Sequence, residues 1–108
     1  MTVLTIRAHK RYATRQRVRL RAGRAKAIDG LLIELSAEGV RISNLGSALF
    51  AIGQAIIVQI GERDYHGLVR WSHDGLAGVR LDRALHAQEV AGLLEQGRMA
   101  AEPLRMAS

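Results

Sequence analysis

Two short segments of the chain combine residue types that suit a phosphorylated, guanine-like ligand. The first segment holds Arg11 and Arg15, and the second holds Glu34, Ser36 and Gly39. An arginine fork matches the oxygens of a phosphate and also the O6/N7 edge of guanine. A carboxylate can accept hydrogen bonds from the N–H groups on the opposite edge of that base, and a serine hydroxyl can satisfy a remaining group. We therefore treat these five residues as candidate ligand contacts.

Strict alternation over residues 16–22 predicts a half-buried strand that follows the two arginines directly. Val18 and Leu20 lie on one face of this strand, and arginines occupy the other face. Asp29-Gly30 is a hairpin signal within the next apolar segment, which is read either as one strand or as two. The further strands are expected over residues 25–35, 40–43, 54–60, 65–73 and 76–82. Six short strands joined by turns favour an antiparallel barrel or sandwich.

The end of the chain changes from a strand pattern to a helix pattern. Asp82 is the expected N-cap of this helix, and Gly97 is its expected C′ residue. The apolar stripe has the spacing i, i+3, i+4 and i+7, and it consists of Ala87, Val90, Ala91 and Leu94. We predict one amphipathic helix against the barrel, followed by a frayed tail over residues 98–108.

Charge is distributed unevenly along the chain. The net charge is +6, but the first 28 residues hold nine of the sixteen basic residues and none of the ten acidic residues. An anionic partner is therefore expected to meet the N-terminal segment. The chain has no cysteine and no apolar run long enough to span a bilayer. A cytoplasmic location is expected.

The two segments resemble the signature of the PilZ domain, a bacterial receptor for cyclic di-GMP. Its Arg-x-x-x-Arg motif is matched by Arg11 and Arg15, and its Asp/Asn-x-Ser-x-x-Gly motif is matched at Ser36 and Gly39. Glu34 stands where the family has Asp or Asn, and Lys10 stands where arginine is common. The resemblance covers roughly residues 7–96, because the order of strands, glycines and a final helix also fits.

The resemblance implies a mainly β fold, a six-stranded antiparallel β-barrel with one C-terminal α-helix, and an unbroken second strand. It implies a flexible basic arm over residues 1–15, a barrel with its helix over residues 16–97, and cyclic di-GMP as ligand without a further cofactor. Ligand binding would order the arm and signal to a downstream protein partner. The five motif residues would contact the ligand. Additional candidate contacts are Lys10, Tyr12, Trp71 and Arg80.

Other interpretations of the same residues remain open. The arginines also suit a solvated face, Ser36 suits an ordinary turn, and Trp71 suits packing at the rim of the core. Because Glu34 is one methylene longer than aspartate, a PilZ-like adaptor that binds only protein is one alternative. A small basic barrel that binds nucleic acid ranks behind it, since the chain has four aromatic residues to stack on bases.

Catalytic and metal functions have no sequence support. The four histidines show no metal-ligand spacing with each other or with carboxylates, and no nucleophile elbow, P-loop or dinucleotide fingerprint is present. We therefore expect neither an enzyme nor a metal site.

Overall fold

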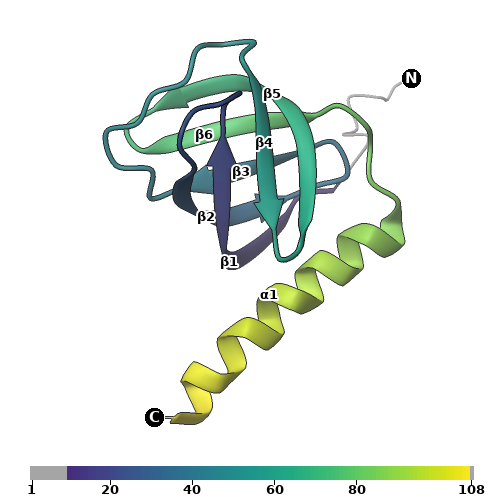
Figure 1. The fold of residues 1–108 in the computed structure, drawn as a ribbon. Helices are drawn as coiled ribbons and strands as arrows, with labels where there is room; N and C mark the ends of the chain where they lie inside the picture. The colour runs from purple at the N-terminus through teal and green to yellow at the C-terminus, as the bar shows by residue number, and fades with distance from the viewer. Residues whose placement is uncertain (1–9, 108) are drawn as a thin grey trace, which may run out of the picture.

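Six antiparallel strands close into a barrel, and one helix follows them (Figure 1). The computed structural model describes residues 10–107, with side chains described for residues 10–100. The elements are β1 (Tyr12–Arg21), β2 (Ile28–Leu35), β3 (Gly39–Ser43), β4 (Ala55–Ile60), β5 (Arg63–His73), β6 (Leu76–Leu81) and α1 (Ala87–Ala107). The strand order is β1-β2-β3-β6-β5-β4, and pairing of β4 with β1 closes the barrel. The mainly β prediction, a six-stranded antiparallel barrel with a C-terminal helix, is confirmed.

Alternating side chains build the core of the barrel. In β1, Val18 and Leu20 are buried, while Arg17 and Arg19 between and beside them are exposed. The same alternation places aliphatic residues from all six strands inside the barrel, where closure leaves no unpaired sheet edge. Arginine side chains are thereby left on the outside, where a ligand or partner can meet them.

Strand β1 begins at Tyr12, four residues before the start that the alternation predicted. Between Ala13 and Gln16 its register against β2 shifts, so one extra residue bulges from β1. The bulge interrupts the period of two and hides the start of the strand from pattern analysis. Residues 12–15 are therefore strand, whereas we expected arm; residues 10 and 11 precede the strand, and residues 1–9 of the expected arm lie outside the described residues.

Strand β2 runs without interruption through Asp29 and Gly30, as the resemblance implied. A Cβ at Gly30 would lie 2.7 Å from Ile42 Cγ2 and 2.9 Å from Leu45 Cδ2. Glycine is needed here because core side chains crowd the backbone. A tight hairpin turn is found instead at Asp74 and Gly75, between β5 and β6. Both of those residues have positive φ, 51° and 76°, as expected for a tight hairpin turn.

The helix starts later and ends later than predicted. Asp82 is not its N-cap, because the backbone N–H of Asp82 donates to His66 O and the chain reaches Ala87 before it becomes helical. Glu89 caps the start by accepting a hydrogen bond from the His86 N–H at 3.1 Å. Gly97 does not end the helix, which continues to Ala107, so the tail expected to fray from residue 98 is helical to that point.

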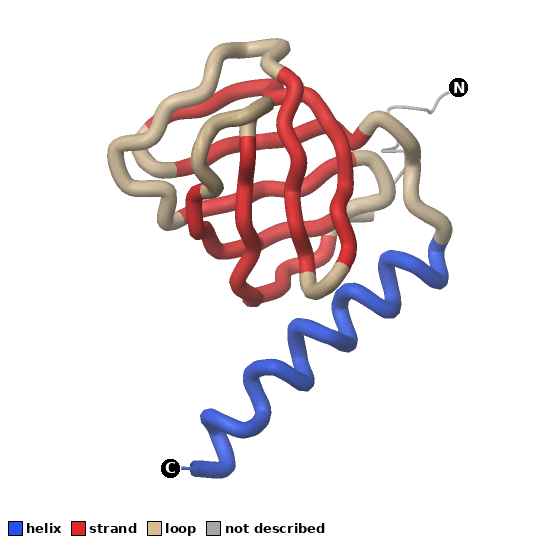
Figure 2. Tube along the Cα trace, viewed as in Figure 1, coloured by secondary structure: helices blue, strands red, loops and turns tan. Residues whose placement is uncertain are grey.

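Helix α1 packs on β1 through its middle (Figure 2). Val90, Leu93 and Gly97 are the buried positions in the described part of the helix, whereas Ala87 and Ala91 of the predicted stripe are exposed. A Cβ at Gly97 would lie 2.8 Å from Thr14 Oγ1, so this glycine permits close approach of helix and strand. Within residues 10–107, no helix has the length of apolar sequence that crossing a membrane requires.

Candidate functional site

A groove of about 310 Å³ lies on the outer face of the barrel over β2, β3, β6 and β5. It begins at Arg11, just before β1, and extends across four neighbouring strands to Trp71 on β5. Its lining residues are Arg11, Glu34, Ser36, Glu38, Gly39, Val40, Arg41, Arg70, Trp71, Gly78, Val79 and Arg80. Residues that are far apart in the sequence therefore share one surface.

Strand register aligns four residues in one row across the floor of this groove. Glu34 pairs with Arg41, Arg41 pairs with Gly78, and Gly78 pairs with Trp71. Both ends of the row follow an irregularity: β2 shifts register between Leu32 and Glu34, and β5 shifts between Val69 and Trp71. Such bulges re-aim side chains, and here they accompany an acid and an indole on the outer face.

Trp71 lies across Gly78 and reaches toward Arg41. A Cβ at Gly78 would lie 2.5 Å from Trp71 Cε2 and 2.9 Å from Cζ2, so the indole occupies the space that a side chain would fill. The guanidinium carbon of Arg41 lies over the indole, 5.4 Å from the ring centroid, within cation–π range. Trp71 is half-buried, so it forms part of an accessible surface.

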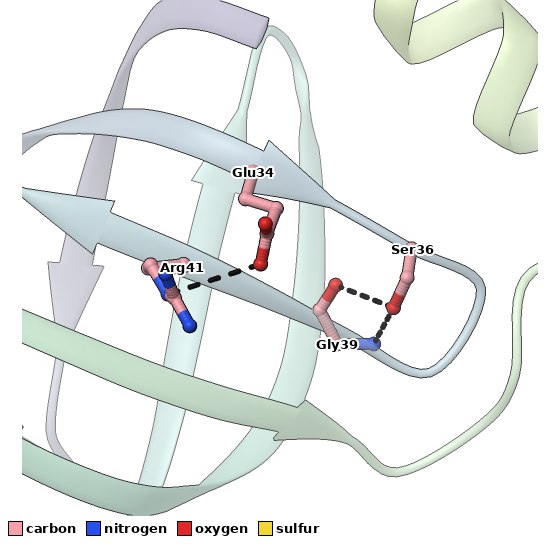
Figure 3. A network of polar contacts seen from close by, with 4 residues as sticks. All are labelled: Glu34, Ser36, Gly39 and Arg41. Atoms are coloured by element: carbon pink, nitrogen blue, oxygen red, sulfur yellow. Dashed lines mark hydrogen bonds and ion pairs between the residues drawn. The ribbon is translucent and has the colours of Figure 1, made fainter. Parts of the chain in front are cut away.

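Glu34 and Arg41 face each other across the β2–β3 pair (Figure 3). Arg41 Nε lies 3.8 Å from Glu34 Oε1, and the two side chains are 41% and 30% exposed. At this distance and exposure the contact is a loose ion pair, worth less than about 1 kcal/mol. Glu34 can therefore exchange Arg41 for another donor at low cost.

Ser36 and Gly39 form the turn between β2 and β3 (Figure 3). Ser36 Oγ accepts hydrogen bonds from the N–H of Gly39 at 3.1 Å and of Glu38 at 3.3 Å, and the Ser36 N–H donates to Gly39 O at 2.9 Å. The φ of Gly39 is not positive, so the turn does not need glycine for its backbone conformation. A Cβ there would lie 2.5 Å from Val79 O, so glycine is required for space.

The charges around the groove favour an anion. Four arginines line it, and two glutamates oppose them. One of the glutamates, Glu34, is already associated with Arg41. Four planar guanidinium groups around one groove suit phosphate oxygens, which they bind through paired hydrogen bonds. The arginines are Arg11, Arg41, Arg70 and Arg80.

The structure brings together most of the residues that the sequence singled out, but separates some of them. Arg11 and the Glu34 segment line the groove, and so do Trp71 and Arg80 from the additional candidates. Arg15 and Tyr12 line a second groove, between the start of β1 and α1, with Leu94 and other helix residues. Lys10 is exposed and does not line either of these two grooves.

Arg41 is one of the groove residues that were not candidates from the sequence, together with Glu38, Arg70 and Gly78. It alternates with the buried residues Val40 and Ile42, which is also the pattern of a solvated strand face. Its position two residues after Gly39, on the strand that leaves the second motif, is the signal that could have found it. Its partner Trp71 is thirty residues further along the chain, and strand register alone makes them neighbours.

The described residues form a six-stranded β-barrel with an arginine-rich outer groove that includes one indole. Among residues 10–107, no group of three or more histidine, cysteine or acidic side chains is arranged to hold a metal ion. No protein-family model matches the chain, and no curated protein matches its sequence. The function must therefore be argued from the groove itself.

Proposed function

We propose that this protein is a PilZ-like receptor for cyclic di-GMP and that the outer groove is its binding site. One observation carries the proposal: Arg11, Glu34, Ser36 and Gly39, chosen from sequence as ligand contacts, line one groove together with Trp71. A groove with guanidinium groups, a carboxylate and an indole offers a partner for each part of a guanine nucleotide. The phosphates meet arginine, and the base meets Glu34 and the indole.

For Arg15 to contact the ligand, the start of β1 must move. Arg15 is exposed, lies within the bulge between Ala13 and Gln16, and lines the second groove instead of the outer groove. Ligand binding would draw the bulged residues toward the outer groove and bring Arg15 to a phosphate. The cyclic dinucleotide would then hold this segment in place and alter the surface offered to a downstream cytoplasmic protein.

A few polar contacts set the scale of the expected affinity. Hydrogen bonds to charged groups are worth roughly 1.5 to 3 kcal/mol each, and micromolar affinity requires about 8 kcal/mol. Arg11, Glu34 and one further arginine of the groove, together with stacking on Trp71, supply about 5.5 to 12 kcal/mol, from which the cost of ordering on binding must be subtracted. Loss of one of these contacts should then weaken binding by about tenfold or more.

Calorimetric titration with cyclic di-GMP tests the proposal. We expect Arg11→Ala and Glu34→Ala to reduce the affinity, while Arg83→Ala serves as the control. Arg83 is exposed in the connection between β6 and α1, and it does not line the groove. Absence of heat for the wild type at high micromolar ligand, together with unchanged Trp71 emission, would rule out the receptor function.

A second candidate function is a PilZ-like adaptor that binds protein and no nucleotide. The observation that favours it is the pairing of Glu34 with Arg41 and of Ser36 with its own turn, since both polar groups already have partners. Glu34→Asp separates the two functions. A wild type that binds no cyclic di-GMP and a Glu34→Asp variant that binds it would identify an eroded site.

A further inference from the structure

Arg41 makes the two contacts that a guanine base would need. Its guanidinium carbon lies 5.4 Å from the centroid of the Trp71 indole. Its Nε lies 3.8 Å from Glu34 Oε1. The aromatic surface and the carboxylate, which are the two groups of the groove suited to a base, are thus both engaged by one side chain.

The chemistry of the guanidinium explains why one group can take both places. A guanidinium and the N1–C2–N2 edge of guanine are each a flat carbon centre with N–H donors that point the same way in the plane. Both hydrogen-bond to a carboxylate, and both stack on an aromatic face. Adenine lacks this donor pair, because its N1 is an acceptor that would face Glu34 with a lone pair.

Strand register holds Arg41 in this position. Arg41 pairs with Glu34 on β2 and with Gly78 on β6, and Gly78 pairs with Trp71 on β5. Since Gly78 has no side chain, nothing stands between the guanidinium and the indole. Arg41 is nevertheless 41% exposed, so solvent and neighbouring space are available to it when it leaves.

We propose that Arg41 is an internal competitor for the guanine base, occupying the base position of the groove until the ligand displaces it. This inference rests on the proposed function, because it requires a ligand that carries guanine. The competition lowers the affinity for every guanine ligand by the strength of the contacts that Arg41 must give up. Exposed cation–π and ion-pair contacts are together worth about a fivefold change in the binding constant.

Two substitutions separate competition from an ordinary phosphate contact. Arg41→Gln removes the charge, and Arg41→Lys keeps the charge but loses the planar donor set. A competitor predicts that Arg41→Gln binds cyclic di-GMP about fivefold tighter than the wild type, whereas Arg41→Lys, whose ammonium can still pair with Glu34 and lie over the indole, gains less. If Arg41 instead binds a phosphate of the ligand, Arg41→Gln should bind cyclic di-GMP more weakly and Arg41→Lys should bind it with nearly unchanged affinity. Arg83→Gln is the matched control, because it removes an arginine outside the groove.

The experiment is calorimetric titration of the wild type, both Arg41 variants and the control with cyclic di-GMP and with cyclic di-AMP. Tighter binding of Arg41→Gln to cyclic di-GMP, without a gain for cyclic di-AMP, supports the proposal. Binding that appears only when Arg41 is replaced by glutamine also supports it. Equal or weaker binding of Arg41→Gln overturns the competition and leaves the receptor function standing, whereas no binding by any protein overturns both.

Fluorescence of the ligand-free protein gives a second measurement. Trp71 is the single tryptophan of the chain and lines the groove, so the emission of the protein reports on this side chain. Arg41→Gln and Arg41→Lys should each change the emission maximum or intensity, with melting temperatures close to that of the wild type. Unchanged emission would show that Arg41 does not cover the indole and would overturn the competition irrespective of any ligand.

Discussion

Replacing Gly78 by alanine should displace the Trp71 indole while the barrel stays folded. The added Cβ would lie 2.5 Å from Trp71 Cε2 and 2.9 Å from Cζ2. Carbon atoms in contact normally lie about 3.5 to 4.0 Å apart, so the ring must move by about 1 Å or more. Because the clash involves a side chain that is half-buried, the indole can turn outward without separating the strands.

The expected stability change for Gly78→Ala is small. The displaced indole loses its contact with Arg41, which is worth about 0.5 to 1 kcal/mol at an exposed site. Alanine in a strand gains roughly 0.5 to 1 kcal/mol over glycine, because less backbone entropy is lost on folding. The two effects nearly cancel, so the melting temperature should shift by less than about 8 °C, the change that 1 kcal/mol causes in a domain of this size.

The expected change in the groove is large. Stacking of a base on an aromatic side chain is worth about 1 to 3 kcal/mol, so affinity for cyclic di-GMP should fall by about tenfold. Trp71 emission should shift toward that of exposed tryptophan, and a melt followed by circular dichroism should remain cooperative.

Gly67→Ala is the matched comparison for Gly78→Ala. Its Cβ would collide with the carbonyl oxygen of Arg80, so the clash is with backbone and β5 must move away from β6. This variant should lose at least about 2 kcal/mol, as overpacking of a well-packed region does. If Gly78→Ala is destabilised as strongly as Gly67→Ala, or if its Trp71 emission equals that of the wild type, the assignment of the indole to the space above Gly78 is wrong.

Three further substitutions test the packing of the fold. Gly92→Ala should raise stability by about 0.5 to 1 kcal/mol, because the helix position is open and alanine is the better helix former, and a thermal melt checks this. Gln16→Ala removes the hydrogen bond from Nε2 to Leu93 O at 2.9 Å, so the free energy of unfolding should fall by about 1 to 2 kcal/mol. Unchanged amide exchange in α1 would show that this hydrogen bond does not hold the helix. Gly39→Ala should cost about 1 to 3 kcal/mol, since its Cβ meets Val79 O, and denaturant unfolding at the wild-type midpoint would contradict it.

The barrel was predictable because its strands alternate, and the errors occurred where local rules compete. The bulge between Ala13 and Gln16 breaks the period of two, so the first residues of β1 were read as arm. Gly97 looks like a helix C′ residue in sequence, but it is the point where α1 approaches Thr14. The sequence alone does not distinguish a glycine that ends a helix from a glycine that permits close packing. Only the position of the neighbouring strand separates the two roles.

The site was predictable as a set of residues but not as an arrangement. The residues within each motif stand close together in the sequence, so Arg11 and Glu34 could be chosen from their chemistry. The row from Glu34 to Trp71 depends on the register of four strands, which local patterns do not determine. Arg41 therefore resembled a solvated strand residue, and the second groove that Arg15 lines required the position of α1.

Helix α1 is attached to β1 up to Gly97, and the helix continues for ten residues beyond that contact. Gln16 holds Leu93 O, Gly97 lies against Thr14, and Arg11 at the groove is five residues from Gln16 along the chain. At a rise of about 1.5 Å per residue, the ten residues from Gly97 to Ala107 span about 15 Å. A tilt of about 10° at that contact would therefore carry the end of the helix by about 2.6 Å. Any change in the angle between β1 and α1 is therefore largest at the C-terminal end of the helix.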